Sequence, residues 1–197
     1  FRYEATATGQ LVVFDAITDI IFDSAIQGLI LAVGLTAGFL VVAYAVLEGK
    51  PYLGIVNVFP ILVAIAFLIG TMRALGLSLN ALTATILSIS IGLGIAYSVH
   101  ATHRFIDEYN SDRNAYDAMI TTLSGTGGAL LGSMLTTSLG TGALALAITP
   151  VLGDFGLLMA LSVLYSFVFT VVALPPAVLL WERYRSTPTG QPAASSA

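Results

Sequence analysis

Long apolar segments separated by short charged breaks dominate the chain. Five segments contain no Asp, Glu, Lys or Arg, and they cover residues 24–47, 53–72, 79–103, 124–148 and 155–181. As helices, segments of this length cross a hydrocarbon core of about 30 Å. None of them is a stretch of about ten residues with alternating polarity, which is the pattern of membrane β-strands. The pattern predicts an all-α integral membrane protein, a bundle of five transmembrane helices.

The composition excludes several classes of protein. Of the 197 residues, 57% are apolar and only 9% are charged, whereas soluble domains carry about 25% charged residues. The chain has no cysteine and a net charge of −4, so it has no disulfides, no thiolate metal sites and no polybasic patch. We therefore expect membrane lipid as a partner, no nucleic acid, no cofactor, no metal and no enzymatic activity.

The charged breaks predict the orientation in the membrane. If the N-terminus lies outside, the external side carries only two cations and the internal side five: Arg2 and Arg73 against Lys50, Arg104, Arg113, Arg183 and Arg185. Cytoplasmic loops are enriched in Lys and Arg. We predict a multi-pass plasma-membrane protein with its N-terminus outside and its C-terminus in the cytoplasm.

The two ends and the longest break differ from the spans. Residues 1–10 are typical of the end of an external soluble domain, and residues 185–197 are rich in Pro, Ser and Ala, which predicts a disordered cytoplasmic tail. The mixed charges of residues 104–123 predict a cytoplasmic loop with a short surface helix. We assign residues 11–184 to one membrane domain, and we expect a larger polypeptide upstream because an external N-terminus must be translocated.

Three carboxylates precede the first span at four-residue spacing. Asp15, Asp19 and Asp23 share one face of a helix, which would allow a cation site. Like charges at this spacing repel each other, and no other type of ligand is nearby. The pattern favours a solvated helix face.

Small residues recur at four-residue spacing inside the spans. Gly34 and Gly38 form a GxxxG pair, as do Gly128 and Gly132. Inside lipid, such residues let helices approach closely, and they also suit an interface that slides between two arrangements. The sequence is compatible with both.

Two polar groups accompany these small residues. Ser88, Gly92 and Ala96 form a stripe that His100 extends. The fourth span holds a cluster of hydroxyls, among them Ser133, Thr136 and Thr137. Hydroxyls of this kind either bond their own helix carbonyls or line a polar seam in the bundle. His100 either titrates near neutral pH or is an interfacial polar residue.

One motif carries a family resemblance. Residues 92–97 read Gly-Leu-Gly-Ile-Ala-Tyr, and His100, Arg104-Phe105 and Glu108 follow. This resembles the fourth-helix signature of the RND superfamily, in its MMPL and Patched-like branch, which is usually Gly-x-Gly-x-Asp-Tyr. Further motifs follow in the family's order: Leu135-Thr136-Thr137, Gly140, Pro150 and Phe155-Gly156. The resemblance covers about residues 5–184.

The resemblance implies a proton-driven exporter of lipids or other hydrophobic compounds. It implies that these spans end one half of a two-half protein, with the N-terminal half and the external porter domains as partners within the same polypeptide. The family relay pairs Asp with Tyr, but the Asp position here is Ala96. Tyr97 then either bonds an Asp from the other half or is simply packed, with Ser88, Gly92 and Ala96 at the contact. The alternative is a sterol-sensing-like sensor or a non-transporting scaffold.

Overall fold

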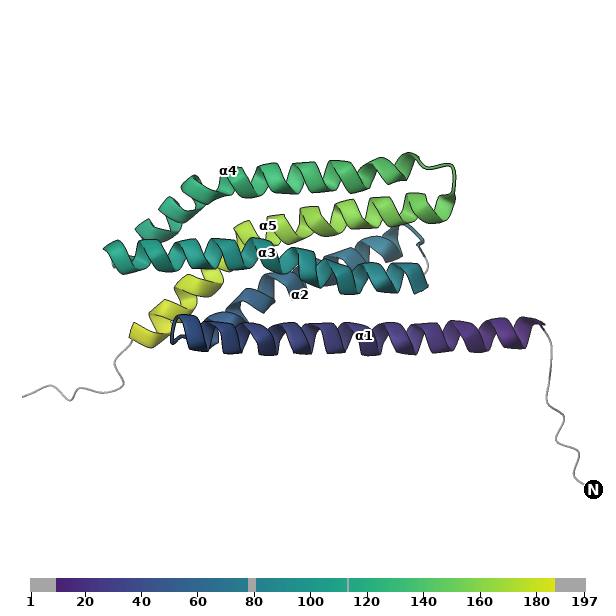
Figure 1. Ribbon diagram of the computed structural model, residues 1–197, viewed down its shortest axis with the longest axis horizontal. Coiled ribbons are helices and arrows are strands. Elements are labelled where there is room, and N and C mark those ends of the chain that lie inside the picture. Colours follow the sequence, from purple (N-terminus) through teal and green to yellow (C-terminus); the bar gives the residue numbers. More distant parts are fainter. Residues whose placement is uncertain (1–9, 78–80, 113, 187–197) are drawn as a thin grey trace, which may run out of the picture.

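The computed structural model describes residues 10–77, 81–112 and 114–186, which form five long helices joined by short turns (Figure 1). The elements are α1 (Gln10–Leu47), α2 (Tyr52–Ala74), α3 (Ala81–Asp112), α4 (Ala115–Gly142), the 3-10 turn η1 (Ala143–Leu146) and α5 (Pro150–Ser186). All five helices are long and apolar enough to cross a membrane. A helix satisfies its backbone hydrogen bonds internally, as lipid requires. The predicted all-α bundle of five spans is confirmed.

The helices surround a central α3. α3 packs against each of the other four helices, and α5 packs against α2, α3 and α4. α1 and α4 lie on opposite sides of the bundle (Figure 1). Only 11% of the span in α1 and in α4 is buried, against 50% in α2 and α3. The two outer helices therefore leave most of their surface to lipid or to other protein.

The bundle has two ends, which we name after the cations that mark them. The Arg73 end contains the C-terminus of α2 and the N-termini of α1, α3 and α5; the Arg104 end contains their opposite termini. Each half has its own buried apolar cluster, one around Ile61, Leu68 and Leu158 and the other around Phe105 and Leu174. The chain of α1 and the chain of α5 run in the same direction along this axis (Figure 1).

Glycine ends α2 at the Arg73 end. Gly76 has φ of 69°, a backbone conformation that a residue with Cβ adopts only with strain. The amide of Leu77 donates to the Met72 carbonyl at 2.9 Å, and the amide of Gly76 donates to the Arg73 carbonyl at 3.3 Å. These two bonds make a Schellman motif, which fixes Arg73 in the last turn of the helix.

Close helix approaches occur at glycines other than the two GxxxG pairs. A Cβ on Gly54 would lie 2.5 Å from the backbone nitrogen of Val41, so α1 and α2 touch there through their backbones. A Cβ on Gly156 would lie 2.7 Å from the Thr141 carbonyl oxygen. By contrast, Gly34, Gly38, Gly128 and Gly132 have open space beside them in the described part of the chain. Of the two interpretations of those pairs, tight packing between helices of this bundle is therefore wrong.

The predicted loop over residues 104–123 is also wrong. α3 continues to Asp112, and α4 begins at Ala115, where the Asn114 side chain accepts a hydrogen bond from the Tyr116 amide. Charged residues tell where a span leaves the bilayer, but a helix continues into water wherever its residues favour it. The two helices simply extend past the apolar region.

Parts of the predicted terminal domains lie outside the described residues. Gln10 is the first residue of α1, so residues 1–9 of the expected external domain are not described. At the other end α5 continues through Ser186, and residues 187–197 of the expected tail lie beyond it.

Candidate functional site

A pocket of about 160 Å³ opens between α3, α4 and α5 near the middle of the bundle. Its polar lining comes from residues of the motif and of the hydroxyl cluster, namely Tyr97, His100, Ser133 and Thr137. Ala96 lies beside them, and both Ala96 and His100 are exposed on the surface of the bundle. The pocket therefore has an open side that the described residues do not cover.

Tyr97 is the best-buried polar residue of this pocket. Its side chain is only 6% exposed, and its ring packs edge-on against Phe167 of α5, with centroids 6.1 Å apart. Within the described part of the chain, no hydrogen bond joins the Tyr97 hydroxyl to another group. A buried phenol normally finds a hydrogen-bond partner. The site therefore has a hydroxyl ready to bond water or an incoming polar group.

The three hydroxyl residues singled out in α4, Ser133, Thr136 and Thr137, divide into two kinds. Ser133 and Thr137 line the pocket. Thr136 instead donates to the carbonyls of Gly132 and Ser133, both at 3.0 Å, on its own helix. Such back-bonding satisfies a hydroxyl without any partner helix. Of the predicted seam, only Ser133 and Thr137 reach the pocket.

The two members of the predicted stripe nearer the Arg73 end, Ser88 and Gly92, lie outside this pocket. Ser88 lines a separate pocket of about 270 Å³ between α1 and α3, where Gly28 faces it. Gly92 is exposed, with open space around it. Of the four residues in the stripe, only the two nearer the Arg104 end, Ala96 and His100, share the pocket with Tyr97.

The chemistry available in this pocket is hydrogen bonding. No carboxylate lines it, and the titratable groups that do are the Tyr97 phenol and the His100 imidazole. Across the described ranges, no cluster of three His, Cys, Asp or Glu side chains could hold a metal ion. A volume of 160 Å³ accommodates several water molecules, since each occupies about 30 Å³ in the liquid. The pocket suits water or a carboxylate from outside this bundle.

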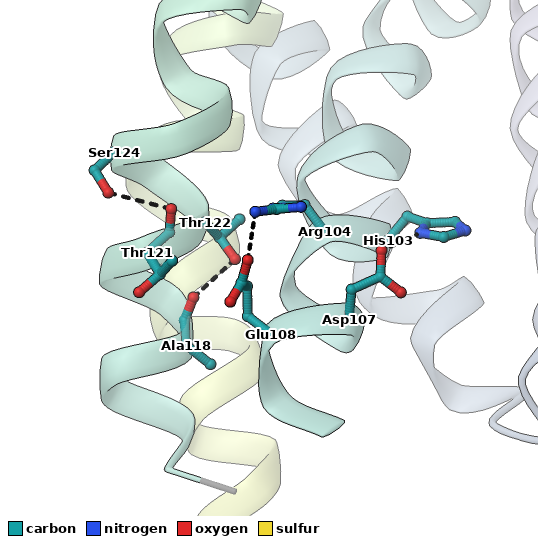
Figure 2. Close-up of polar contacts among 8 residues, drawn as sticks. All are labelled: His103, Arg104, Asp107, Glu108, Ala118, Thr121, Thr122 and Ser124. Carbon is teal, nitrogen blue, oxygen red and sulfur yellow. Dashed lines mark hydrogen bonds and ion pairs between the residues drawn. The ribbon is translucent and has the colours of Figure 1, made fainter. Parts of the chain in front are cut away.

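Charged residues of α3 gather between the pocket and the Arg104 end of the bundle. The guanidinium of Arg104 pairs with Glu108 beside α4, while His103 and Asp107 lie on a different side of α3, 3.3 Å apart (Figure 2). On α4, Thr122 donates to the Ala118 carbonyl at 2.8 Å. Both contacts join residues four apart on α3; three of the four side chains are exposed, and that of Glu108 is 19% exposed. Helix pairs at this spacing stabilise little. The two contacts lie near the C-terminal end of α3.

A second polar stripe of α3, which is buried, was not predicted from the sequence. Ser90, Gly94, Ser98 and Thr102 follow each other at four-residue spacing on α3, and all four are buried. The hydroxyls of Ser98 and Thr102 donate to the side-chain oxygen of Asn57 on α2, at 2.7 and 2.8 Å. The signal was present in the sequence, since Asn57 is the one amide side chain within the second span.

The same stripe meets hydroxyls of α5. Ser162 donates to the Ser90 hydroxyl, and Ser166 packs where Gly94 has no side chain. Thr170 continues the α5 series, is 1% exposed, and has no hydrogen-bond partner for its hydroxyl among the described residues. The centre of the bundle is therefore held by neutral hydrogen bonds between α2, α3 and α5.

Comparison with known proteins identifies relatives of this chain. Residues 4–182 match the MMPL family. Over 135 residues the chain is 33% identical to the membrane protein MJ1562 of Methanocaldococcus jannaschii. The aligned region covers 68% of this chain and 35% of that relative, so the chain spans well under two thirds of the length of the relative that it matches.

Proposed function

Because this chain belongs to the MMPL family, whose members are transporters, we propose that it forms part of the membrane domain of a proton-driven exporter. The proposed substrates are lipids or other hydrophobic compounds. The remaining parts are a second membrane half and external porter domains within a longer polypeptide. We place the protein in the plasma membrane with the Arg104 end in the cytoplasm and without enzymatic activity.

The observation that carries this proposal is the open pocket beside Tyr97. A proton-driven bundle needs an ionisable group inside the membrane, because protonation can then bias two arrangements of the helices. The five spans supply no Asp or Glu, but the pocket presents a buried phenol toward an uncovered face. A carboxylate from the second half would complete the site by bonding the Tyr97 hydroxyl.

Exposed glycines support docking of that half on the outer surface of the bundle. Gly128 and Gly132 of α4 are exposed with open space beside them, as is Gly92 of α3. Helices associate in lipid through close packing at small residues. None of these glycines lines the pocket, and Gly128 and Gly132 lie on the face of α4 opposite Leu130 and Thr137. They therefore offer a contact for the second half that is separate from the open side of the pocket beside Ala96 and His100.

The test replaces Tyr97 with Phe in the full-length protein and measures extrusion of a hydrophobic dye from cells, with and without a proton gradient. The change removes one hydroxyl and keeps the ring that packs on Phe167. We expect gradient-dependent extrusion to fall at least tenfold, as when a positioned proton-transfer group is removed. Tyr165→Phe is the control, because the Tyr165 hydroxyl does not line the pocket and instead shares a 2.9 Å hydrogen bond with the Thr71 hydroxyl. Unchanged extrusion by the Tyr97 variant would refute the relay.

One observation favours a second candidate, a sensor or scaffold. Ala96 occupies the position of the family's acid, and the five uncharged segments of the sequence contain no Asp or Glu. If the matching helix of the second half also lacks an acid, no carboxylate relay is possible and the sensor is favoured. Its signature would be ligand-dependent thermal stabilisation of the full-length protein without any gradient-dependent extrusion.

A further inference from the structure

His100 lies between the Tyr97 pocket and the charged end of α3. Its side chain lines the pocket together with Tyr97 and is exposed on the open side of the bundle. Along the helix axis it is about 4.5 Å from Tyr97, three residues before it, and about 6 Å from Arg104, four residues after it. The imidazole is therefore within about one helical turn of both the pocket and the Arg104 end.

His100 and Tyr97 are the ionisable side chains that line the pocket. The lining side chains from α4 and α5 are neutral, namely Leu130, Ser133, Thr137 and Val163. An imidazole gains and loses a proton near neutral pH, whereas a phenol does so only at about pH 10. Of the two, His100 is the group that can take up a proton as a positive charge and release it again under physiological conditions.

The stretch of α3 beyond His100 carries a compensated charge. Arg104, one turn further along, pairs with Glu108, and the contact between His103 and Asp107 lies on a different side of the helix (Figure 2). An unpaired arginine would oppose an imidazolium one turn away, because like charges at this spacing repel. Since Glu108 compensates that cation, a proton can rest on His100 and then leave toward the Arg104 end.

We propose that His100 is a proton shuttle, which transfers protons between the Tyr97 pocket and water at the Arg104 end. The proposal rests on the proposed function and adds the step by which a proton leaves the site. The carboxylic acid of the second half gives its proton, through the Tyr97 hydroxyl, to one ring nitrogen of neutral His100, and the other ring nitrogen gives a proton to water. The acid becomes a carboxylate and the imidazole returns to its neutral form, so one proton moves and nothing else is consumed.

The test uses the full-length protein in liposomes and measures extrusion of a hydrophobic dye driven by a membrane potential. His100→Ala should slow extrusion at least tenfold, since a positioned proton-transfer group commonly contributes more than this. Imidazole added on both sides of the membrane should restore a large part of the lost rate, because the free base carries the proton that the side chain no longer carries. A potential drives the assay because imidazole, a permeant weak base, would dissipate a pH difference.

His103→Ala is the matched control and should leave extrusion unchanged, because His103 is on the same helix but lies outside the pocket and contacts Asp107. Tyr97→Phe, which keeps His100, should gain nothing from imidazole. An unchanged rate in His100→Ala, or a loss that imidazole does not restore, would overturn the shuttle, while potential-driven extrusion by the unmodified protein would still support the proposed function. If the unmodified protein shows no driven extrusion, the proposed function fails and the shuttle fails with it.

Discussion

The Ser98 hydroxyl donates to the side-chain oxygen of Asn57 at 2.7 Å, and this bond joins the two helices whose spans are most buried. The same Asn57 oxygen accepts from Thr102 at 2.8 Å, while the Asn57 amide donates to the Leu53 carbonyl at 2.9 Å. One amide thus satisfies hydroxyls from two turns of α3. Neutral groups bonded in this way fix the register of α2 against α3 without placing a charge in the membrane.

Replacing Asn57 with Leu should destabilise the bundle. The change would leave the hydroxyl of Thr102, which is fully buried, without its acceptor, whereas Ser98 would keep its 2.9 Å bond to the backbone carbonyl of residue 57. An unsatisfied buried polar group costs about 1–3 kcal/mol. The measurement is thermal unfolding of the full-length protein in detergent. Ser88→Ala serves as the control, because Ser88 is only partly buried and should change the midpoint little.

A double-mutant cycle would measure the Asn57–Ser98 interaction itself. The coupling free energy between Asn57→Ala and Ser98→Ala should be about 0.6 kcal/mol, which is the typical value for interhelical hydrogen bonds in membrane proteins. A coupling of zero would mean that the Asn57 side-chain oxygen adds nothing to the 2.9 Å bond that the Ser98 hydroxyl makes to the Asn57 backbone carbonyl.

Glycines 54 and 70 of α2 offer a matched pair for testing helix packing. A Cβ on Gly54 would meet the backbone of α1 at 2.5 Å, so no change of rotamer relieves the overlap. Gly54→Ala should therefore destabilise by about 1–3 kcal/mol, the range seen for overpacked sites. Gly70 has open space, and Gly70→Ala should be neutral or stabilising by up to about 1 kcal/mol. Equal effects on the unfolding midpoint would refute the backbone contact.

The ion pairs at the Arg104 end should contribute little to stability. Arg104 and Glu108 are four residues apart on α3, with the arginine side chain 48% and the glutamate side chain 19% exposed. Helix pairs at this spacing stabilise by about 0.3–0.5 kcal/mol. Glu108→Gln should therefore shift the free energy of unfolding by less than about 0.5 kcal/mol. A loss above about 2 kcal/mol would indicate a buried role for this pair.

The amino-acid sequence predicts the number and place of the spans because lipid imposes one simple condition, a long apolar helix. It does not predict which face of each helix points inward. Ser88, Gly92, Ala96 and His100 share one stripe of α3, and Ser90, Gly94, Ser98 and Thr102 share another with the same spacing. The first is largely exposed and the second is buried. Since small and polar residues lie on both of these faces of α3, periodicity alone does not distinguish them.

The site was predicted in part for the same reason. Tyr97, Ala96 and His100 were selected by a sequence motif, and Ser133 and Thr137 by their crowding in one span; the fold brings these five to one pocket. Ser88 and Thr136 were predicted on the same grounds. Ser88 instead lines the pocket between α1 and α3, and the Thr136 hydroxyl bonds a carbonyl of its own helix. These outcomes depend on how each helix is rotated about its axis, which the spacing of polar residues does not determine.

The absence of cysteine from this chain allows a direct test of the orientation that we propose. Single cysteines would be placed at Thr149, in the exposed turn before α5 at the Arg73 end, and at Asn110, exposed near the end of α3 at the Arg104 end. The full-length protein, with any other cysteine removed, would be treated in intact cells with a maleimide that does not cross membranes. If the Arg104 end is cytoplasmic, as the excess of cations there favours, Thr149→Cys is labelled and Asn110→Cys is labelled only after the cells are opened. The reverse pattern would invert the proposed topology, and it would place the side of the Tyr97 pocket nearest Arg104 toward the outside.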